Sequence, residues 1–367
     1  MADSLSNGFW DRHAFSVGGA GFSWRDVILA AMARGEWSAF ERRLAHGLAC
    51  EARAASADAP ADCDAVDEAA TAFRYDHDLI SAADVTAWLD RVGVCAEEWT
   101  AYFTRAVLRD RWDGELDDVL DRYAPSARVL VEAAVSEGIC SGVFEAFERT
   151  LAGRAAFVFE SDAAGFERAL RSAASPAIDA EADRLAELHA HWLSRPASAE
   201  MVARLRVILQ IDAVFHGLVE RVTSNGQMAA IVEANRLEWM RLELDVVSFP
   251  TENAAREALL CVREDGLSLY DVAALAHRAV TRSTVTLQDL APGCQEQLIG
   301  AEPGRVLGPL ATTSNGAAEG QQLFDVYKLI GRKAPTADDP AVAARAREEL
   351  VTRALTRAVR EHVKRHG

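Results

Sequence analysis

The chain has 367 residues and a formal net charge of −17, with 50% hydrophobic and 26% charged residues. This length predicts two or three domains, and this composition is that of a folded protein and not of a disordered one. The acidic balance argues against a nucleic-acid-binding surface, which needs clustered Lys and Arg.

No stretch reaches the ~20 apolar residues of a membrane span. Residues 1–25 lack the basic segment and apolar run of a secretory signal. The six cysteines are scattered, without a C-x-x-C pair or a matched spacing to histidine, which indicates reduced thiols. We therefore expect a cytoplasmic protein with no membrane partner, and the sequence leaves its oligomeric state open.

Residues 1–240 predict one helix after another. Through residues 24–49, apolar side chains recur at three- and four-residue spacing, which predicts a pair of helices with one buried face. A break that contains Pro and Asp follows at 59–64, and Gly93 separates a later pair of helices. Strands are expected only between about 240 and 330.

One segment of this helical region occurs twice. Gly35–Ala45 and Gly142–Ala152 are identical at seven of eleven positions, and the third position is aromatic in both. The segment at 87–97 is similar to the segment at 191–200, and these two segments are separated by nearly the same number of residues as the first two copies. Such a repeat indicates a duplicated unit whose copies bury their faces against each other, with chance similarity in an alanine-rich chain as the alternative.

The period changes at residue 242. From 242 to 247 the apolar residues alternate, which predicts a strand, and Pro250 ends it. A helix is expected from about Asn253 to Glu264, followed by a short helix capped by Ser268 with Asp271 in its first turn. With a last strand at about 323–329, these elements predict a small α+β domain.

The last segment predicts one more amphipathic helix, with Pro340 at its first position. Its apolar stripe must be buried, and we expect it to pack back on the helical region. The predicted fold is therefore mainly α with a small α+β domain. The expected ranges are a helical unit at 1–125, a second at 126–239, the α+β domain at 240–336, and the helix at 337–367.

Two motifs in the α+β domain point to a family. In Gly266–Ala273 a glycine is followed three positions on by a large apolar residue, and then by an apolar-alanine pair. In Pro303–Pro309, Pro-Gly sets a tight turn and Gly-Pro a second bend. On these motifs, residues 242–330 resemble the parvulin domain of SurA- and PrsA-type foldases, which are PpiC-like peptidyl-prolyl isomerases.

The helical remainder fits the same architecture. In SurA- and PrsA-type proteins a helix after the parvulin domain completes the N-terminal helical module, and the segment 340–366 is placed to do so. Residues 73–99 resemble the helix-loop-helix unit of that module. The layout is also similar to accessory proteins of bacterial peptide-maturation systems. The resemblance thus implies a duplicated SurA-N-like module, a parvulin-like domain, and an unfolded or precursor peptide as the partner.

The resemblance also implies positions for the two catalytic histidines of the family, and both are altered. The first corresponds to Asp245 on the first strand of the domain, and the second to Gln322 near the start of the last strand. A buried carboxylate needs a partner, and an apolar prolyl cleft does not favour one. We therefore expect a pseudo-isomerase. Any remaining activity would be peptidyl-prolyl cis-trans isomerisation.

Six aromatic residues are candidates for contact with a peptide: Phe73, Trp88, Trp99, Phe103, Phe249 and Phe324. The spacing of those between 88 and 103 suits a helical core, which we favour over a peptide groove. No metal or cofactor is expected. His189 and His191 are two apart in a predicted helix and diverge, so they do not predict a zinc site. Gly18–Gly21 lacks the lysine of a phosphate loop and predicts a flexible loop.

Two classes of function remain open. The first is a peptide-binding chaperone or substrate-presenting protein, acting in the maturation of a ribosomal peptide, whose parvulin-like domain lacks isomerase activity. The second is an enzyme, either an active peptidyl-prolyl cis-trans isomerase or a peptide-modifying enzyme that uses the parvulin-like cleft. Asp245 and Gln322 disfavour isomerisation but leave another chemistry open.

Overall fold

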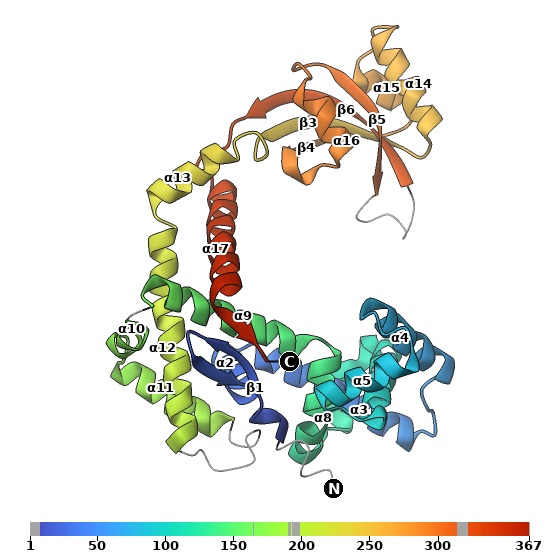
Figure 1. The fold of residues 1–367 in the computed structure, drawn as a ribbon. Coiled ribbons are helices and arrows are strands. Elements are labelled where there is room, and N and C mark those ends of the chain that lie inside the picture. The colour runs from blue at the N-terminus through green and yellow to red at the C-terminus, as the bar shows by residue number, and fades with distance from the viewer. Residues whose placement is uncertain (1–7, 164, 190–191, 193–198, 314–321, 367) are drawn as a thin grey trace. The chain divides into compact units, whose positions relative to one another are not determined.

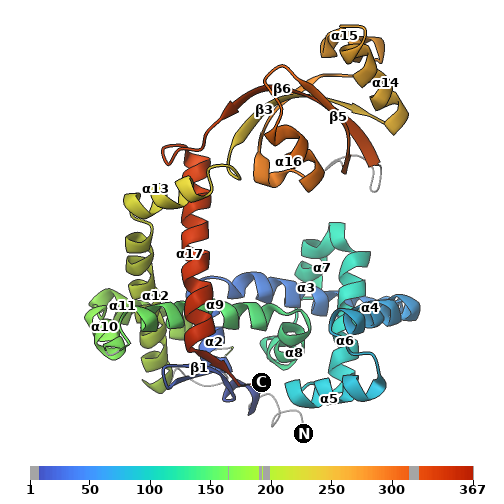
Figure 2. The same ribbon diagram turned by 45° about the horizontal axis from the view of Figure 1, so that its top comes forward.

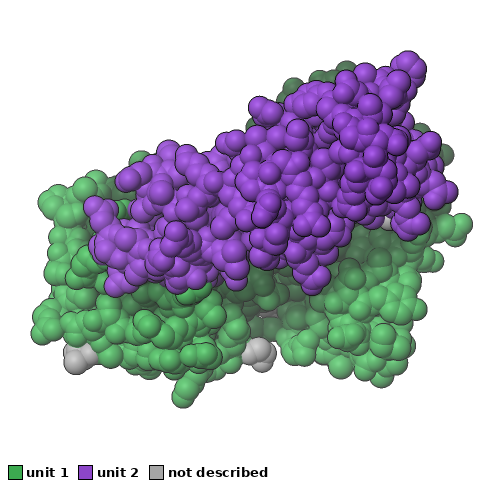
Figure 3. Space-filling view, turned by 90° about the horizontal axis from the view of Figure 1, so that it is seen from above, with its two compact units in different colours: residues 1–221, 353–367 green, residues 222–352 purple. Residues whose placement is uncertain are grey.

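The computed structural model describes residues 8–163, 165–189, 192, 199–313 and 322–366 (Figure 1). The chain divides into two compact units, marked by colour in Figure 3. Unit 1 comprises residues 1–221 and 353–367, and unit 2 comprises residues 222–352. As expected, the fold is mainly α with a small α+β part. The four ranges expected from the sequence differ from this division and stay a proposal.

Unit 1 is largely helical. Its helices are α2 (Trp24–Ala33), α3 (Trp37–Ser56), α4 (Cys63–Asp76), α5 (Ala82–Val92), α6 (Ala96–Arg111), α7 (Leu116–Arg122), α8 (Ala127–Cys140), α9 (Val143–Ser161), α10 (Phe166–Ser172), α11 (Pro176–Leu188) and α12 (Ala199–Val222). The last residue of α12, Val222, is the first residue of unit 2. Local signals set their ends. Ser23 and Asp26 form a capping box at the start of α2, and Gly93 ends α5 with a positive φ.

Unit 1 also contains a three-stranded antiparallel sheet that the sequence did not predict. Its strands are β1 (His13–Val17), β2 (Ala20–Ser23) and β7 (Val363–Arg365), in the order β2-β1-β7. The expectation of a flexible loop at Gly18–Gly21 was wrong. Gly18 and Gly19 have φ of 57° and 90°, the values of a two-residue hairpin turn, so these glycines join β1 to β2.

The two copies of the sequence repeat occupy equivalent places in unit 1. Gly35 and Gly142, which open the copies, both have positive φ, at 74° and 71°. Helix α2 packs against α9, and α3 packs against α8. Ring centroids are 6.3 Å apart for Trp37 and Phe144, 5.4 Å for Phe40 and Phe144, and 6.5 Å for Trp37 and Phe147. In these contacts, the first helix of each pair packs against the second helix of the other pair. Most of the second echo, at 191–200, lies outside the described residues.

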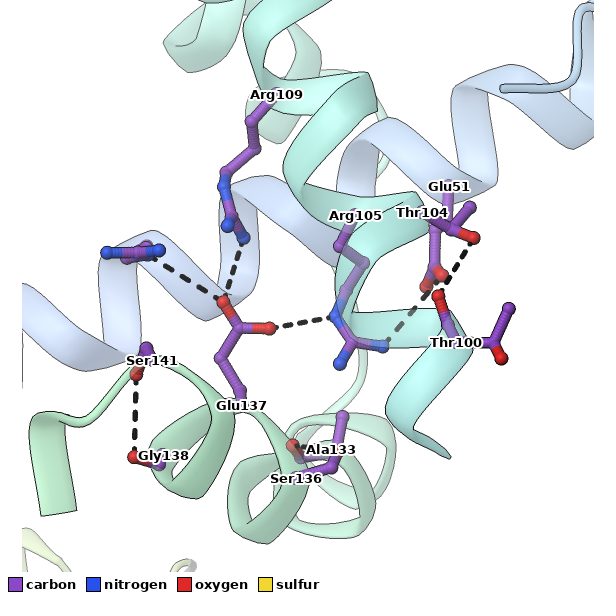
Figure 4. A network of polar contacts seen from close by, with 11 residues as sticks. Glu51, Thr100, Thr104, Arg105, Arg109, Ala133, Ser136, Glu137, Gly138 and Ser141 are labelled. Atoms are coloured by element: carbon purple, nitrogen blue, oxygen red, sulfur yellow. Dashed lines mark hydrogen bonds and ion pairs between the residues drawn. The ribbon is translucent and has the colours of Figure 1, made fainter. Parts of the chain in front are cut away.

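A buried ion network joins three helices of unit 1 (Figure 4). The carboxylate of Glu137 on α8 is fully buried and accepts hydrogen bonds from Arg105 Nε at 3.0 Å and Arg109 Nη1 at 2.9 Å, both on α6. Two residues of α3 extend the network. Arg43 Nε lies 3.7 Å from Glu137 Oε1, and Glu51 Oε1 lies 3.8 Å from Arg105 Nη1. Buried charges are tolerated only when they are paired in this way.

Unit 2 is built on a four-stranded antiparallel sheet in the order β4-β3-β6-β5. Its elements are α13 (Asn225–Ala234), β3 (Arg241–Phe249), α14 (Glu252–Arg263), α15 (Leu269–Leu275), β4 (Thr281–Thr286), α16 (Pro292–Ile299), β5 (Val306–Thr313) and β6 (Gln322–Lys333). Ser268 and Asp271 form the expected capping box of α15. Strand β4 lies in a segment for which the sequence analysis named no element.

The sheet of unit 2 lies between α16 and the pair α14 and α15 (Figure 2). It separates two hydrophobic clusters. Leu242 and Leu244 of β3 pack with Leu298 of α16 on one face. Val247 and Phe249 pack with α14 and α15 on the other face. Successive residues of a strand point to opposite faces, so the alternation seen in the sequence places side chains on either side of the sheet.

Helix α17 (Pro340–His362) begins at Pro340, as expected, and runs from unit 2 into unit 1. In unit 2, Val342 and Ala346 pack with Ile231 of α13. In unit 1, Arg357 pairs with Glu160 of α9 at 2.7 Å. No helix in the described part of the chain is long and apolar enough to cross a membrane.

Candidate functional site

Unit 1 contains a cavity of about 480 Å³ where α2, α3 and α11 meet. Its apolar lining residues are Met32, Ala33, Trp37, Leu185 and Leu188, and its polar ones are Ser38, Glu41, Arg184 and His189, with Gly35 between them. Leu188 is 55% exposed, whereas Met32, Trp37 and Leu185 are buried, so the apolar wall reaches solvent at Leu188. A cavity of this size and lining is typical of a site for a small molecule or a few side chains.

The turn between α2 and α3 fixes one wall of this cavity. Gly35 has a positive φ, and the backbone N–H of Glu36 donates to Ala31 O at 2.9 Å. The side chain of Arg34 holds Glu36 through two hydrogen bonds of 2.9 and 3.2 Å. The first turn of α3 therefore presents Trp37, Ser38 and Glu41 to the cavity in a set geometry.

Trp192 supports the acidic side chain of the cavity. Its indole N–H donates to Glu41 Oε1 at 3.1 Å, and its ring packs edge-on against Trp37 with centroids 5.0 Å apart. Arg184, the cationic residue in the lining, forms an ion pair with Glu181 at 2.6 Å. The cavity therefore combines an apolar wall with a positioned carboxylate and a guanidinium that already has a counter-charge.

In unit 2, Asp245 is buried and has two partners. Its carboxylate accepts from Tyr270 Oη at 2.7 Å and from Arg282 Nε and Nη2 at 2.9 and 3.2 Å. Hydrogen bonds from Arg282 and Tyr270 lower the pKa of Asp245, although burial opposes them. These partners stabilise the ionised carboxylate, and they occupy the oxygen atoms that proton transfer would need.

The structure does not bring Asp245 and Gln322 together. Asp245 lies opposite Lys328 in the pairing of β3 with β6, and Gln322 begins β6 six residues earlier. At about 3.3 Å per residue, this offset separates the two positions by roughly 20 Å along the strand. A joint site of the two residues is therefore not formed, and their individual roles stay predictions.

The opposite face of the sheet carries a polar pair that sequence reasoning missed. Asp325 on β6 is buried and accepts a hydrogen bond from Tyr327 Oη at 3.0 Å. Burial, together with the negative charge of Asp325, raises the pKa values of the Tyr327 phenol and of the Cys294 thiol on α16. With their pKa values raised, the phenol and the thiol are protonated at neutral pH. The sequence signal for this pair was an aspartate placed between two apolar residues of a strand.

The aromatic residues proposed for peptide contact lie in hydrophobic clusters. Phe73, Trp88, Trp99 and Phe103 belong to one cluster of unit 1, with Phe73 and Trp88 ring centroids 5.3 Å apart and Trp99 and Phe103 4.9 Å apart. In unit 2, Phe249 and Phe324 are paired across β3 and β6 within one cluster. Their packing roles are clear, and their contact with a peptide stays a prediction.

Sequence reasoning also missed the cavity, because its walls come from segments about 150 residues apart. Among the described residues, no group of three or more His, Cys, Asp and Glu side chains is arranged to hold a metal ion. His191, which the sequence paired with His189, lies outside the described residues. All six cysteines are free thiols.

No protein-family model matches the sequence, and no curated protein matches it. The solved structures similar to the chain include foldases and SurA-like chaperones. The foldase PrsA from Lactococcus lactis is 12% identical with a TM-score of 0.23, over 58% of this chain and 77% of that one. PrsA from Streptococcus pneumoniae is 12% identical with a TM-score of 0.24, over 57% and 82%. A SurA-like chaperone from Campylobacter jejuni is 12% identical with a TM-score of 0.17, over 51% and 78%. Similarity at this level does not identify the function.

Proposed function

We propose that the chain is a peptide-binding chaperone or substrate-presenting protein, and that the cavity between α2, α3 and α11 takes an apolar side chain of an unfolded or precursor peptide. The observation that carries the proposal is Leu188, an apolar residue of the cavity lining that is 55% exposed beside the buried Met32 and Leu185. Burying apolar surface there contributes about 25 cal/mol per Å². A partly exposed Leu188 at such a wall is stabilised when a ligand covers it.

In this proposal the parvulin-like domain is a scaffold without isomerase activity. Asp245 is engaged by Arg282 and Tyr270, and the strands β3, β4, β5 and β6 contain no histidine in their sequences. An active isomerase or a peptide-modifying enzyme remains the competing function, which an assay can distinguish. The six free thiols fit action in the cytoplasm, and the maturation of a ribosomal precursor peptide is the setting that we propose.

Binding is tested by titrating a fluorescently labelled unfolded peptide with the purified full chain and measuring anisotropy. Leu188→Glu places a charge in the apolar wall and should weaken binding at least about tenfold, equivalent to about 1.4 kcal/mol. Leu260→Glu on α14 is the matched control, because Leu260 is 56% exposed and lies outside the cavity. If neither variant changes the affinity, or if the wild-type chain binds no unfolded peptide, the proposal is wrong.

Isomerase activity is tested on the same preparations with a protease-coupled assay on Xaa-Pro tetrapeptides. We expect no acceleration above the uncatalysed rate by the wild-type chain. Rapid isomerisation that Asp245→Ala abolishes would contradict the pseudo-isomerase proposal and support the enzyme.

A further inference from the structure

Strand β4 forms an open edge of the sheet in unit 2. It is the end strand in the order β4-β3-β6-β5, and all of its residues pair with β3 without a register shift. The side chains of Thr281, Arg282 and Thr284 are exposed. A regular strand at the edge of a sheet presents unpaired N–H and C=O groups, with which another extended chain can pair.

The hydrogen bonds to β3 determine which backbone groups of β4 face outward. The backbone N–H of Leu287 donates to Met240 O at 2.9 Å. Residues of an antiparallel pair bond to the neighbouring strand at every second position. In the register of β4 with β3, the N–H and C=O groups of Arg282, Thr284 and Thr286 therefore point away from β3. No other strand in the described part of the chain pairs with them.

The opposite edge of the same sheet is closed. On β5, Pro309 has no N–H to donate, and Arg263 Nη2 donates to the carbonyl oxygen of Val306 at 3.2 Å. Helix α14 packs against β5, and a register shift interrupts the pairing of β5 with β6. Strand β4 contains no proline and no register shift, so it is the edge that can accept another strand.

The charges along β4 favour an acidic partner. Residues 272–286 contain two arginines and no acidic residue, although the chain has a net charge of −17. Arg278, just before β4, is exposed. Arg282 is 64% exposed and donates to Asp245 through Nε and Nη2. This contact fixes the guanidinium over the sheet, while its Nη1 has no acceptor in the described part of the chain.

The acidic side chains near this edge leave the positive charge accessible. Asp245 compensates part of the charge of Arg282, but its side chain is only 1% exposed. Lys328 lies opposite Asp245 on β6 and adds a positive charge on the same face. The carboxylate of Glu243 lies close to Gly331 of β6, on the side of β3 that is away from β4.

We propose that β4 binds an extended acidic segment of a partner polypeptide, which adds a fifth strand to the sheet and places its carboxylates against Arg278 and Arg282. The inference goes beyond the proposed function, because it rests on unit 2 alone and would stand if the cavity of unit 1 bound nothing. A second copy of the chain fits this edge less well, because two β4 strands would bring arginines together and supply no carboxylate.

The probe is a labelled eight-residue peptide of threonine and valine that carries two glutamates four residues apart, the spacing of the two arginines. The purified full chain should bind it about 3- to 10-fold more tightly than the same peptide with two glutamines. Raising the salt concentration should reduce this preference, because the ion pairs are exposed. Fluorescence anisotropy measures both affinities.

Strand pairing is tested separately from charge. N-methylation of two adjacent central residues of the glutamate peptide removes one donor from each of its edges and keeps its charge. Binding should weaken at least about tenfold, because a β-ladder needs these N–H groups. This comparison uses the wild-type chain and does not depend on the folding of a variant.

Thr284→Pro blocks the edge from the side of the protein. The N–H of Thr284 faces away from β3, so its loss breaks no hydrogen bond of the sheet. The variant should bind the glutamate peptide at least about tenfold more weakly. Thr284→Val keeps the N–H and is the matched control that should bind like the wild type. Circular dichroism checks that both variants fold.

The role of Arg282 is tested with a pair of variants that share one change. Asp245→Asn combined with Arg282→Gln removes the guanidinium without leaving a buried carboxylate uncompensated. Its preference for the glutamate over the glutamine peptide should fall at least about twofold. Asp245→Asn alone keeps Arg282 and should retain the full preference.

The remaining outcomes contradict the proposal. Equal binding of the glutamate and glutamine peptides, or binding that N-methylation leaves unchanged, overturns it, as does a wild-type chain that binds neither peptide. A dimer in sedimentation that Thr284→Pro dissociates would identify a second copy as the occupant. Loss of the glutamate peptide in Leu188→Glu would assign its binding to the cavity of unit 1. The proposed function has its own unfolded peptide as a probe, so either proposal can fail alone.

Discussion

Both units bury a carboxylate, but they compensate its charge in different ways. In unit 1, Glu137 is fully buried, and the side chains of Arg105 and Arg109 that bind it are only 3% and 10% exposed. In unit 2, the Asp245 side chain is 1% exposed, whereas Arg282 is 64% exposed. The network of unit 1 is thus closed off from water, while the pair in unit 2 reaches the surface.

This difference determines what happens when the acid is removed. Without Glu137, two guanidinium groups stay buried and lose their main counter-charge, and Arg105 Nη2 already lacks a hydrogen-bond partner. Without Asp245, the side chain of Arg282 can turn into solvent. The buried charges of unit 1 are therefore a framework on which α3, α6 and α8 depend, whereas the pair in unit 2 contributes less.

The largest effect is expected for Glu137→Ala. Breaking a buried ion network by removing one partner costs about 3–5 kcal/mol, because the remaining charges are left uncompensated. Urea unfolding followed by circular dichroism measures this loss. Glu132→Ala is the control on the same helix, since Glu132 forms an exposed pair with Arg128 and should cost less than about 0.5 kcal/mol. Similar losses in both variants would mean that the network does not stabilise unit 1.

A smaller loss is expected for Arg365→Ala, which leaves Glu148 buried without its guanidinium. An unsatisfied buried polar group costs about 1–3 kcal/mol. Hydrogen exchange should show faster exchange of the amides that pair β7 with β1. Arg360→Ala, whose side chain is 75% exposed, is the control and should leave that exchange unchanged. Unaltered protection in Arg365→Ala would show that the ion pair does not hold β7.

Asp245→Asn should cost only about 1 kcal/mol, because the lost partner is largely solvated and the hydrogen bond to Tyr270 is weakened but not removed. Thermal unfolding of the variant measures the change, with Asp265→Asn on an exposed position of unit 2 as the reference. A loss as large as that of Glu137→Ala would remove the distinction between the two units.

The smallest effect is a difference in pH dependence. Partners lower the pKa of Asp245, so its contribution to stability is present above the unfolded value of about 3.9 and is lost as the pH falls through the lower folded value. Burial raises the pKa of Glu148, so its contribution is complete below the unfolded value of about 4.3 and is lost as the pH rises through the folded value. Unfolding of Asp245→Asn and Glu148→Gln across pH 2–7, each compared with the wild type, should therefore show opposite trends. Parallel trends would contradict these shifts.

Much of the fold could be predicted because its signals are local. Ser268 and Asp271 are three residues apart and form a capping box, Pro340 begins α17, and the alternation at 242–247 lies within β3. The repeat was also readable, since helical spacing and a conserved aromatic pattern are properties of a short segment. For the site, the sequence required a partner for a buried Asp245 but could not name Tyr270 or Arg282.

The sequence by itself determined the mainly helical character, the small α+β part and the need to compensate any buried acid. The tertiary structure alone decided the rest, because those features depend on residues far apart in the chain. Strand β7 exists by pairing with β1 at the other end of the sequence, Arg282 reaches Asp245 across 37 residues, and α11 closes a cavity begun by α2 and α3. Three residues such as Val363–Arg365 carry too weak a local preference to predict a strand, and only the hydrogen bonds and the ion pair offered by distant partners make that conformation stable.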